Sequence, residues 1–395
     1  KHPRPLAEYS TLWRDRAARI LGGDPAGWAA TVVEAATGAA PTGPVLTAAD
    51  VDDRVVADVA ATVLAAVEGR RSTWSRWNVT AQAAREIGIR GWQFATPTDL
   101  LAVRDSITAR ALGGSVLLNP PEIAAVPAKW RDPSTGRSAF AAKEIFTSRA
   151  VLDAEARLLA AADDTSGPTA PPTTSAVAES TAVDAEQTAA AAAIYGSGRV
   201  LDLLVGPAGT GKTATVTAIR AAWVAEHGEN SVIGLAVSAA AHILQEATGA
   251  PAETAAMWLT RHRHADETLR RLAELQRRRA RMRGDTATID GQITTLREDF
   301  THSRLRPGSL IICDEAGMAD VHTLDALTDA ARQAGAKILL VGDNHQLAAV
   351  GPGGSFGMLA TRRGAAVAHL SNIRRFRDPD GTTRAWEADA SARLR

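Results

Sequence analysis

The chain has 395 residues, enough for roughly two or three domains, and its 44 lysines and arginines balance 44 aspartates and glutamates. A neutral chain has no global field to attract a polyanion, so any nucleic-acid site must be a local basic patch. Cys313 is the single cysteine, which excludes a disulfide framework and a cysteine-based zinc site. Because no run of about 18 apolar residues occurs, we expect no membrane span and a cytoplasmic protein.

Residues 1–162 are predicted to form a mainly helical accessory domain, because apolar residues recur at spacings of three and four through much of it. Two helical segments and two strand-like runs follow one another at 78–87, 98–112, 115–119 and 139–147. This order is that of a winged helix over residues 72–147, whose second helix would lie on duplex DNA. A helical domain that only packs fits the same order, so both interpretations stay open.

Residues 163–182 are rich in Asp, Thr, Ser, Gly and Pro. Such a segment buries too little apolar surface to offset its ordering entropy, so we predict a flexible linker. The domain boundary is placed here, with a second domain over residues 183–395. Strand candidates in that second domain lie at 200–205, 231–237, 310–315, 337–341 and 365–369.

A glycine-rich stretch follows the first of these strands and precedes a helix-compatible segment, 214–226. Its residues are Gly206, Pro207, Ala208, Gly209, Thr210, Gly211, Lys212 and Thr213. This is the phosphate-loop pattern in its strand–loop–helix context, where glycines let several backbone N–H groups converge on an anion. Lys212 is expected to reach the β- and γ-phosphates, and the Thr213 hydroxyl to ligate Mg²⁺. The sequence therefore predicts binding of a nucleoside triphosphate, ATP with Mg²⁺.

Two acids, Asp314 and Glu315, end the strand candidate at 310–315. Ligands of parallel sheets bind at the carboxyl ends of the strands, so the acids are expected beside the phosphate loop. Asp314 is predicted to hold the Mg²⁺ shell, and Glu315 to act as the general base for the attacking water.

Three further signals are weak in isolation. Gln187 lies just before the phosphate-loop strand, where its amide can donate to and accept from an adenine edge. Gln346 follows the strand candidate at 337–341 and can sense the γ-phosphate or position a water molecule. Arg374 and Arg375 follow the last strand candidate, where an arginine can stabilise transition-state charge.

Residues 261–300 are predicted to form a helical hairpin inserted into the α/β domain. Arginines outnumber acids on its first arm, which suits a phosphate backbone. A solvated hairpin with no partner fits the same pattern.

Taken together, the motifs Gln187, Gly206–Thr213, Asp314-Glu315, Gly342–Leu347 and Arg375 resemble the first motor domain of RecD-like superfamily 1 helicases. The resemblance covers roughly residues 183–380. It implies an α/β fold of the RecA-like P-loop NTPase type and 5′→3′ translocation on single-stranded DNA. It further implies that Gln187 contacts adenine, that Gln346 senses the γ-phosphate, and that Arg375, which precedes Phe376, is the arginine finger. Ser238 and Thr254 are then expected at single-strand DNA contacts.

The segment 146–148, followed by an acidic helix containing Glu155, is similar to the region upstream of the motor in MobF-type conjugative relaxase–helicases. This resemblance implies a role in plasmid conjugation and the conjugation coupling machinery as a candidate partner. A relaxase needs a nucleophilic tyrosine and a histidine cluster. The only tyrosines are Tyr9 and Tyr195, and neither has a suitable histidine cluster nearby. We therefore expect a fragment without its nicking domain and without a second motor domain, with weak turnover alone.

Two other functions fit the same motifs. A RecD-type repair helicase shares every motor motif and differs only in having no relaxase upstream. A module that binds single-stranded DNA without productive hydrolysis fits a chain with an incomplete motor.

Overall fold

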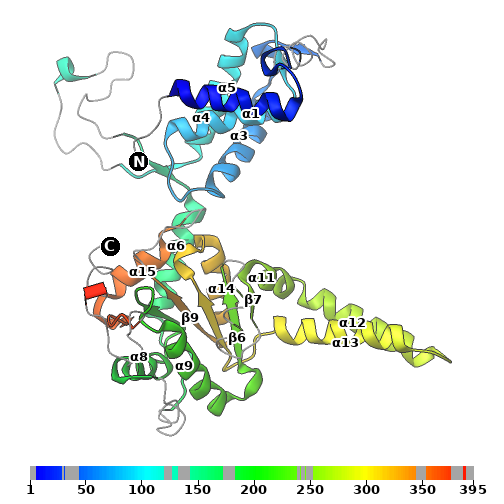
Figure 1. Cartoon of the computed structure of the whole chain (residues 1–395), viewed down its shortest axis with the longest axis vertical. Helices are drawn as coiled ribbons and strands as arrows, with labels where there is room; N and C mark the ends of the chain where they lie inside the picture. The colour runs from blue at the N-terminus through cyan, green and yellow to red at the C-terminus, as the bar shows by residue number, and fades with distance from the viewer. Residues whose placement is uncertain are drawn as a thin grey trace. The chain divides into compact units, whose positions relative to one another are not determined.

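A six-stranded parallel sheet forms the centre of the second half of the chain in the computed structural model (Figure 1). Its strand order is β10-β5-β9-β8-β6-β7. The strands span Leu201–Val205 (β5), Val232–Ala236 (β6), Ala252–Thr254 (β7), Leu310–Asp314 (β8), Lys337–Gly342 (β9) and Ala368–His369 (β10). All except β7 coincide with strand candidates of the sequence, and the predicted α/β class is confirmed.

The structure describes residues 6–28, 31, 44–119, 127–131, 143–171, 183–237, 241, 245, 252–343, 353–374 and 386–387. By its internal contacts the chain divides into two compact units. Unit 1 comprises residues 1–61 and 80–110, and unit 2 comprises residues 62–79 and 111–395. Unit 2 contains the whole sheet.

Helices cover both faces of the sheet because the strand side chains alternate between two apolar cores. In β5, Leu203 packs with one core and Leu204 with the other. The Leu203 face carries α6 (Arg149–Asp163), α11 (Ala255–Arg263), α14 (Val321–Ala334) and α15 (Ser355–Arg363). The Leu204 face carries α8 (Ala185–Tyr195) and α9 (Lys212–His227).

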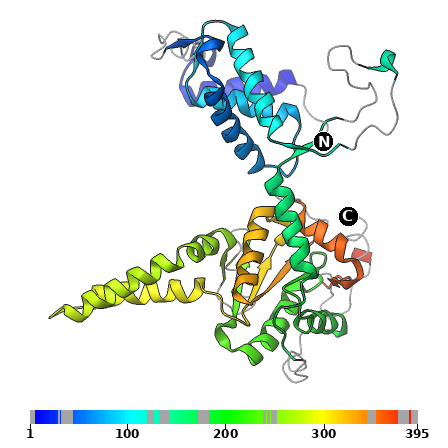
Figure 2. The ribbon, with the colours of Figure 1, turned by 180° about the vertical axis from the view of Figure 1, so that it is seen from behind.

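Helix α6 belongs to the sheet domain, although the sequence places it with the accessory domain. Its apolar side chains Val151, Ala154 and Leu158 are fully or almost fully buried in the core on the Leu203 face. Figure 2 shows α6 lying along α14 on this face. The sequence places the boundary by composition, whereas the apolar stripe of α6 needs a partner, and the sheet domain supplies it.

The predicted linker is described only for residues 163–171, and these are hydrogen-bonded to the sheet domain. The backbone N–H of Gly167 donates to the Gly198 carbonyl at 2.8 Å, and that of Ala170 donates to the Tyr195 carbonyl at 2.9 Å. Ala170 is almost fully buried. This part of the segment is therefore packed, and residues 172–182 lie outside the described residues.

The described residues between 6 and 147, which include unit 1, are mainly helical, as predicted. The helices are α1 (Leu6–Leu21), α3 (Asp53–Glu68), α4 (Arg76–Ile89) and α5 (Pro97–Gly113). Short strands β1 (Val45–Leu46) and β2 (Gln93–Phe94) pair in parallel, and β3 (Val116–Leu117) and β4 (Phe146–Thr147) pair antiparallel. The element order expected for a winged helix is present, and its DNA contact stays a prediction.

Between β7 and β8 the chain forms a helical hairpin of α12 (Ala265–Arg281) and α13 (Ala287–Ser303). It extends away from the sheet in both views (Figures 1 and 2). Leu272, Ile289 and Ile293 form a small buried cluster between the two helices, separate from the cores of the sheet. The ion pair of Arg279 with Asp290, at 2.6 Å, joins the helices near the tip.

A buried ion pair ties the central strands together at the end opposite the phosphate loop. The Lys337 Nζ atom at the start of β9 lies 2.8 Å from an Asp202 carboxylate oxygen of β5, and Lys337 has no exposed surface. The same ammonium donates to the Ser197 hydroxyl at 2.8 Å and to the Arg199 carbonyl at 2.7 Å. Hydrogen bonds of this kind offset the desolvation of a buried charge.

Candidate nucleotide-binding site

The phosphate loop connects β5 to α9. Gly209 and Gly211 have φ angles of 86° and 83°, in the left-handed region that glycine adopts without strain. A side chain at Gly206 would not fit, because its Cβ would lie 2.7 Å from the Thr210 hydroxyl oxygen. The loop is therefore tightly folded at the positive end of the α9 dipole, which favours an anion.

Lys212, the first residue of α9, folds back over the loop. Its Nζ atom donates to the carbonyl oxygens of Gly206 at 2.7 Å and Pro207 at 3.0 Å. Thr213, the next residue, is exposed. A cationic side chain above a loop of N–H donors fits the phosphates of a nucleotide, and a neighbouring hydroxyl fits the metal ion that accompanies them.

Asp314 ends β8 and lies close enough to Lys212 for their charges to interact. Burial raises the pKa of the Asp314 carboxyl, while a 2.9 Å hydrogen bond from the backbone N–H of Glu315 and the Lys212 charge act in the opposite direction. A cation at this carboxylate would offset the cost of burying it in its ionised form. The residues present therefore fit a magnesium ion held by Asp314 and Thr213.

Glu315 is the one residue other than glycine with a positive φ among the described residues, with φ 55° and ψ 32°. A left-handed conformation costs a side chain of this kind about 1–3 kcal/mol, and such strain concentrates at functional sites. The strained turn places Glu315 directly beside Asp314 at the carboxyl end of β8. This position suits the general-base role that the sequence predicts.

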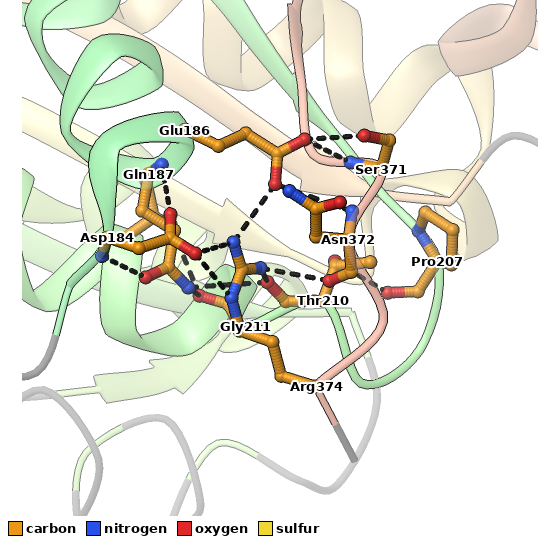
Figure 3. A network of polar contacts seen from close by, with 10 residues as sticks. Asp184, Glu186, Gln187, Pro207, Thr210, Gly211, Ser371, Asn372 and Arg374 are labelled. Atoms are coloured by element: carbon orange, nitrogen blue, oxygen red, sulfur yellow. Dashed lines mark hydrogen bonds and ion pairs between the residues drawn. The ribbon is translucent and has the colours of Figure 1, made fainter. Parts of the chain in front are cut away.

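Arg374 joins the phosphate loop to the first turn of α8 (Figure 3). Its guanidinium forms ion pairs with Asp184, through Nε at 2.8 Å and also through Nη2, and with Glu186 at 3.0 Å. The Glu186 carboxylate also accepts hydrogen bonds from the Ser371 backbone N–H and hydroxyl, at 2.7 and 2.6 Å. Burial alone would raise the pKa of both carboxyls, but hydrogen bonds hold the two pKa values below their usual range. Asp184 accepts from the backbone N–H of Gln187 and from Arg374, and Glu186 accepts from Ser371 and Arg374. We call Asp184, Glu186, Ser371 and Arg374 the α8 clamp.

The clamp and Gln187 hold three successive loop carbonyls. The Gly209 carbonyl accepts from the Arg374 backbone N–H at 2.7 Å, and the Thr210 carbonyl accepts from the guanidinium. The Gln187 side-chain amide donates to the carbonyls of Thr210 and Gly211, both at 3.3 Å. In a trans peptide the N–H points opposite to the C=O. The N–H groups that follow these carbonyls are therefore turned away from the clamp.

The structure accounts for only some of the predicted contact residues. Gln187 is almost fully buried, and its side-chain oxygen accepts from the Asp184 backbone N–H at 3.0 Å. The Thr254 hydroxyl caps α11 by accepting from the backbone N–H of Met257 at 3.3 Å. Ser238, Gln346 and Arg375 lie outside the described residues, so their roles stay predictions.

Sequence reasoning missed the clamp. Asp184 is the N-cap of α8 and Glu186 lies in its first turn. An Asp three residues before a Gln is the spacing of a capping box, and the structure contains that box. The spacing predicts a helix start and gives no sign of a distant arginine. The sequence shows Arg374 only as a neighbour of Arg375, because the pairing of residues 184 and 374 depends on the parallel β5–β10 contact.

Residues 182–395 match the family model described as AAA domain, and the chain belongs to this family. This match accords with the α/β fold, the parallel sheet and the phosphate loop. The chain is also 33% identical over 193 residues to the conjugal transfer protein TraA of Rhizobium radiobacter, covering 49% of this chain and 14% of that protein. It is 30% identical over 209 residues to the probable conjugal transfer protein TraA of Sinorhizobium fredii, covering 53% of this chain and 15% of that protein.

The TraA conjugal transfer protein of Agrobacterium fabrum is 31% identical over 193 residues, or 49% of this chain and 14% of that protein. The chain thus corresponds to a small part of the length of these relatives. The resemblance to helicase motors of conjugal transfer proteins is confirmed. Among the described helices, none combines the length and apolar character needed to cross a membrane.

Proposed function

We propose that the chain is the first motor domain of an ATP-dependent DNA helicase that moves along single-stranded DNA during plasmid conjugation. The observation that carries the proposal is the nucleotide site, where the phosphate loop after β5 and the acidic pair after β8 meet at the carboxyl edge of one parallel sheet. In this arrangement Lys212 binds the β- and γ-phosphates of ATP, and Asp314 and Thr213 hold Mg²⁺. The metal ion neutralises charge on the phosphates when it is bound.

Glu315 takes the proton of the attacking water, and its strained backbone fixes it next to the metal ligand. Gln346 and Arg375 are assigned to γ-phosphate sensing and to transition-state charge. Gln187 is assigned to holding the loop and not to the adenine edge, because its buried side-chain amide already uses both its oxygen and its nitrogen in hydrogen bonds. Ser238 and Thr254 supply contacts to the single strand.

The test is single-turnover hydrolysis of ATP by excess protein, with Mg²⁺ and with or without single-stranded DNA. The native chain is expected to hydrolyse the bound ATP. Glu315→Gln, which keeps the size of the side chain and removes its basicity, is expected to bind ATP equally and hydrolyse it more than about 100-fold more slowly. Equal hydrolysis by both proteins would refute the role of Glu315. Tight ATP binding with no hydrolysis by the native chain would favour a non-motor binding module.

The polarity is a separate part of the proposal and rests on the motor resemblance. Strand displacement by a protein containing this motor, on substrates with a 5′ or a 3′ single-stranded overhang, tests it. Unwinding only of the 5′-overhang substrate is expected. Unwinding only of the 3′-overhang substrate would contradict the 5′→3′ assignment.

A further inference from the structure

The outer face of α12 carries a stripe of arginines. Arg270, Arg271, Arg277, Arg278 and Arg281 are all exposed. At about 100° per residue they lie within roughly one third of the helix circumference, together with Glu267 and Glu274. From Arg270 to Arg281 the stripe extends about 16 Å along the helix.

The opposite face of α12 holds the hairpin together. Leu272 is buried against Ile289 and Ile293 of α13, and Arg279 forms its ion pair with Asp290. The three adjacent arginines 277, 278 and 279 therefore have different roles. Arg279 joins the two helices, whereas Arg277 and Arg278 point to the outer face.

The outer end of the stripe carries more arginines than acids. Residues 275–284 contain five arginines and no aspartate or glutamate. Within the described residues, Arg277, Arg278 and Arg281 form no ion pair and no side-chain hydrogen bond. In a neutral chain, such a local concentration of unpaired guanidinium groups is the feature that a phosphate backbone recognises.

We propose that this arginine stripe binds the phosphate backbone of duplex DNA. Residues 265–284 contain no aromatic side chain. Sites for single strands combine positive charge with aromatic groups on which bases stack, whereas contact with a duplex backbone requires only donors and positive charge. A helix held against its neighbour by a small apolar core presents the arginines in a fixed row, which matches a rigid duplex. The proposal depends on the proposed function for its choice of DNA as the polyanion.

The experiment is fluorescence anisotropy of a labelled 20-base-pair duplex and of a single strand of the same length, titrated with the full chain at several salt concentrations without nucleotide. The test variant is Arg277→Gln/Arg278→Gln/Arg281→Gln. The matched control, Arg306→Gln/Arg332→Gln/Arg362→Gln, removes the same charge from exposed positions outside the hairpin. A third variant replaces Arg277, Arg278 and Arg281 with lysine and keeps their charge.

The native chain is expected to bind the duplex with a steep salt dependence. Each phosphate contact contributes about −0.9 to the slope of log K against log[salt], so the test variant should flatten the duplex slope by up to about 2.7. The control triple and the lysine variant should keep the slope, and single-strand binding should not change. Thermal unfolding of each variant verifies that the fold is intact.

Three results would overturn the proposal. The test variant and the control triple could lose duplex affinity equally, which would indicate net charge alone. The test variant could lose only single-strand affinity, which would place the stripe on the single-strand path. It could also bind both DNA forms like the native chain, leaving an acidic protein as the partner of the stripe. Because nucleotide is absent, failure here is distinguishable from failure of ATP binding, which is measured separately.

Discussion

Replacing Arg374 with alanine is expected to weaken nucleotide binding without unfolding the domain. The Arg374 side chain is 16% exposed and contacts Asp184, Glu186 and the Thr210 carbonyl. Alanine would leave the loop carbonyl without its charged donor, so the loop N–H groups would no longer be fixed in direction before the nucleotide arrives. Pre-organisation of this kind contributes to affinity by reducing the cost of ordering the site.

The size of the loss in ATP affinity depends on how exposed the hydrogen-bond partners of Arg374 are. Leaving a buried polar group fully unsatisfied costs about 1–3 kcal/mol, whereas the Thr210 carbonyl would keep its 3.3 Å hydrogen bond from Gln187. Water can reach part of the clamp, since the Asp184 side chain is 46% exposed. We therefore expect the lower half of that range, about 1–2 kcal/mol, which corresponds to about a 5- to 30-fold increase in the Kd for ATP. Arg374→Lys keeps one positive charge but not the guanidinium's planar set of donors. Its Kd for ATP should lie between that of the native chain and that of Arg374→Ala.

The assay is titration with a fluorescent ATP analogue, followed by competition with ATP and with tripolyphosphate, which has no base. If Arg374 acts through the loop N–H groups, both competitors should weaken by the same factor in Arg374→Ala. A loss confined to ATP would indicate a contact with the base or ribose and would refute the reasoning. Unchanged affinity for both competitors would show that the clamp has no effect on the loop.

Breaking the buried pair by Lys337→Ala should lower the free energy of unfolding by about 3–5 kcal/mol, because the buried Asp202 loses its nearest cation and keeps, among the described residues, only the Ser197 hydroxyl and the Arg363 guanidinium, 4.0 Å away. Denaturant unfolding measures this free energy, and the double variant Lys337→Met/Asp202→Leu is expected to recover it. A loss below about 1 kcal/mol in Lys337→Ala would contradict the prediction. Burial raises the pKa of the Cys313 thiol to about 12, so iodoacetamide at pH 8 should label the unfolded chain and leave the native chain unlabelled. Since burial raises the pKa of Asp314 above 3.8, its ionised form opposes folding at neutral pH. Asp314→Asn should therefore stabilise the nucleotide-free chain at pH 7, with a gain that shrinks as the pH falls toward 3.8, and a pH-independent gain would refute this cause.

The nucleotide site was the part of the fold that local sequence predicted best. Gly206–Thr213 and Asp314-Glu315 are contiguous motifs whose neighbours are strongly apolar strands, so pattern and position agree. For α6 the sequence was less informative. Its alanine and leucine residues predict a helix, but they do not show which domain that helix packs against. Only the packed structure shows that Val151 and Leu158 fill the core of the sheet domain.

Long-range polar contacts were the part that sequence could not predict. The α8 clamp joins residues 184 and 374, and the buried ion pair joins residues 202 and 337. Each pairing is created by the strand order, in which β5 lies between β9 and β10. The hairpin gives an intermediate case: the arginine run was evident, but only the packing of Arg279 against Asp290 separates the joining arginine from those on the outer face.

The binding of ATP with Mg²⁺ by the chain, compared with that by Lys212→Ala, tests the central claim most directly. Isothermal titration of both proteins, with their thermal unfolding measured in parallel, is sufficient. The account predicts saturable binding by the native chain, a Kd raised by more than about tenfold in Lys212→Ala, and the same unfolding temperature for both nucleotide-free proteins. Equal affinity for ATP in a folded Lys212→Ala variant would contradict the assignment of the phosphate loop.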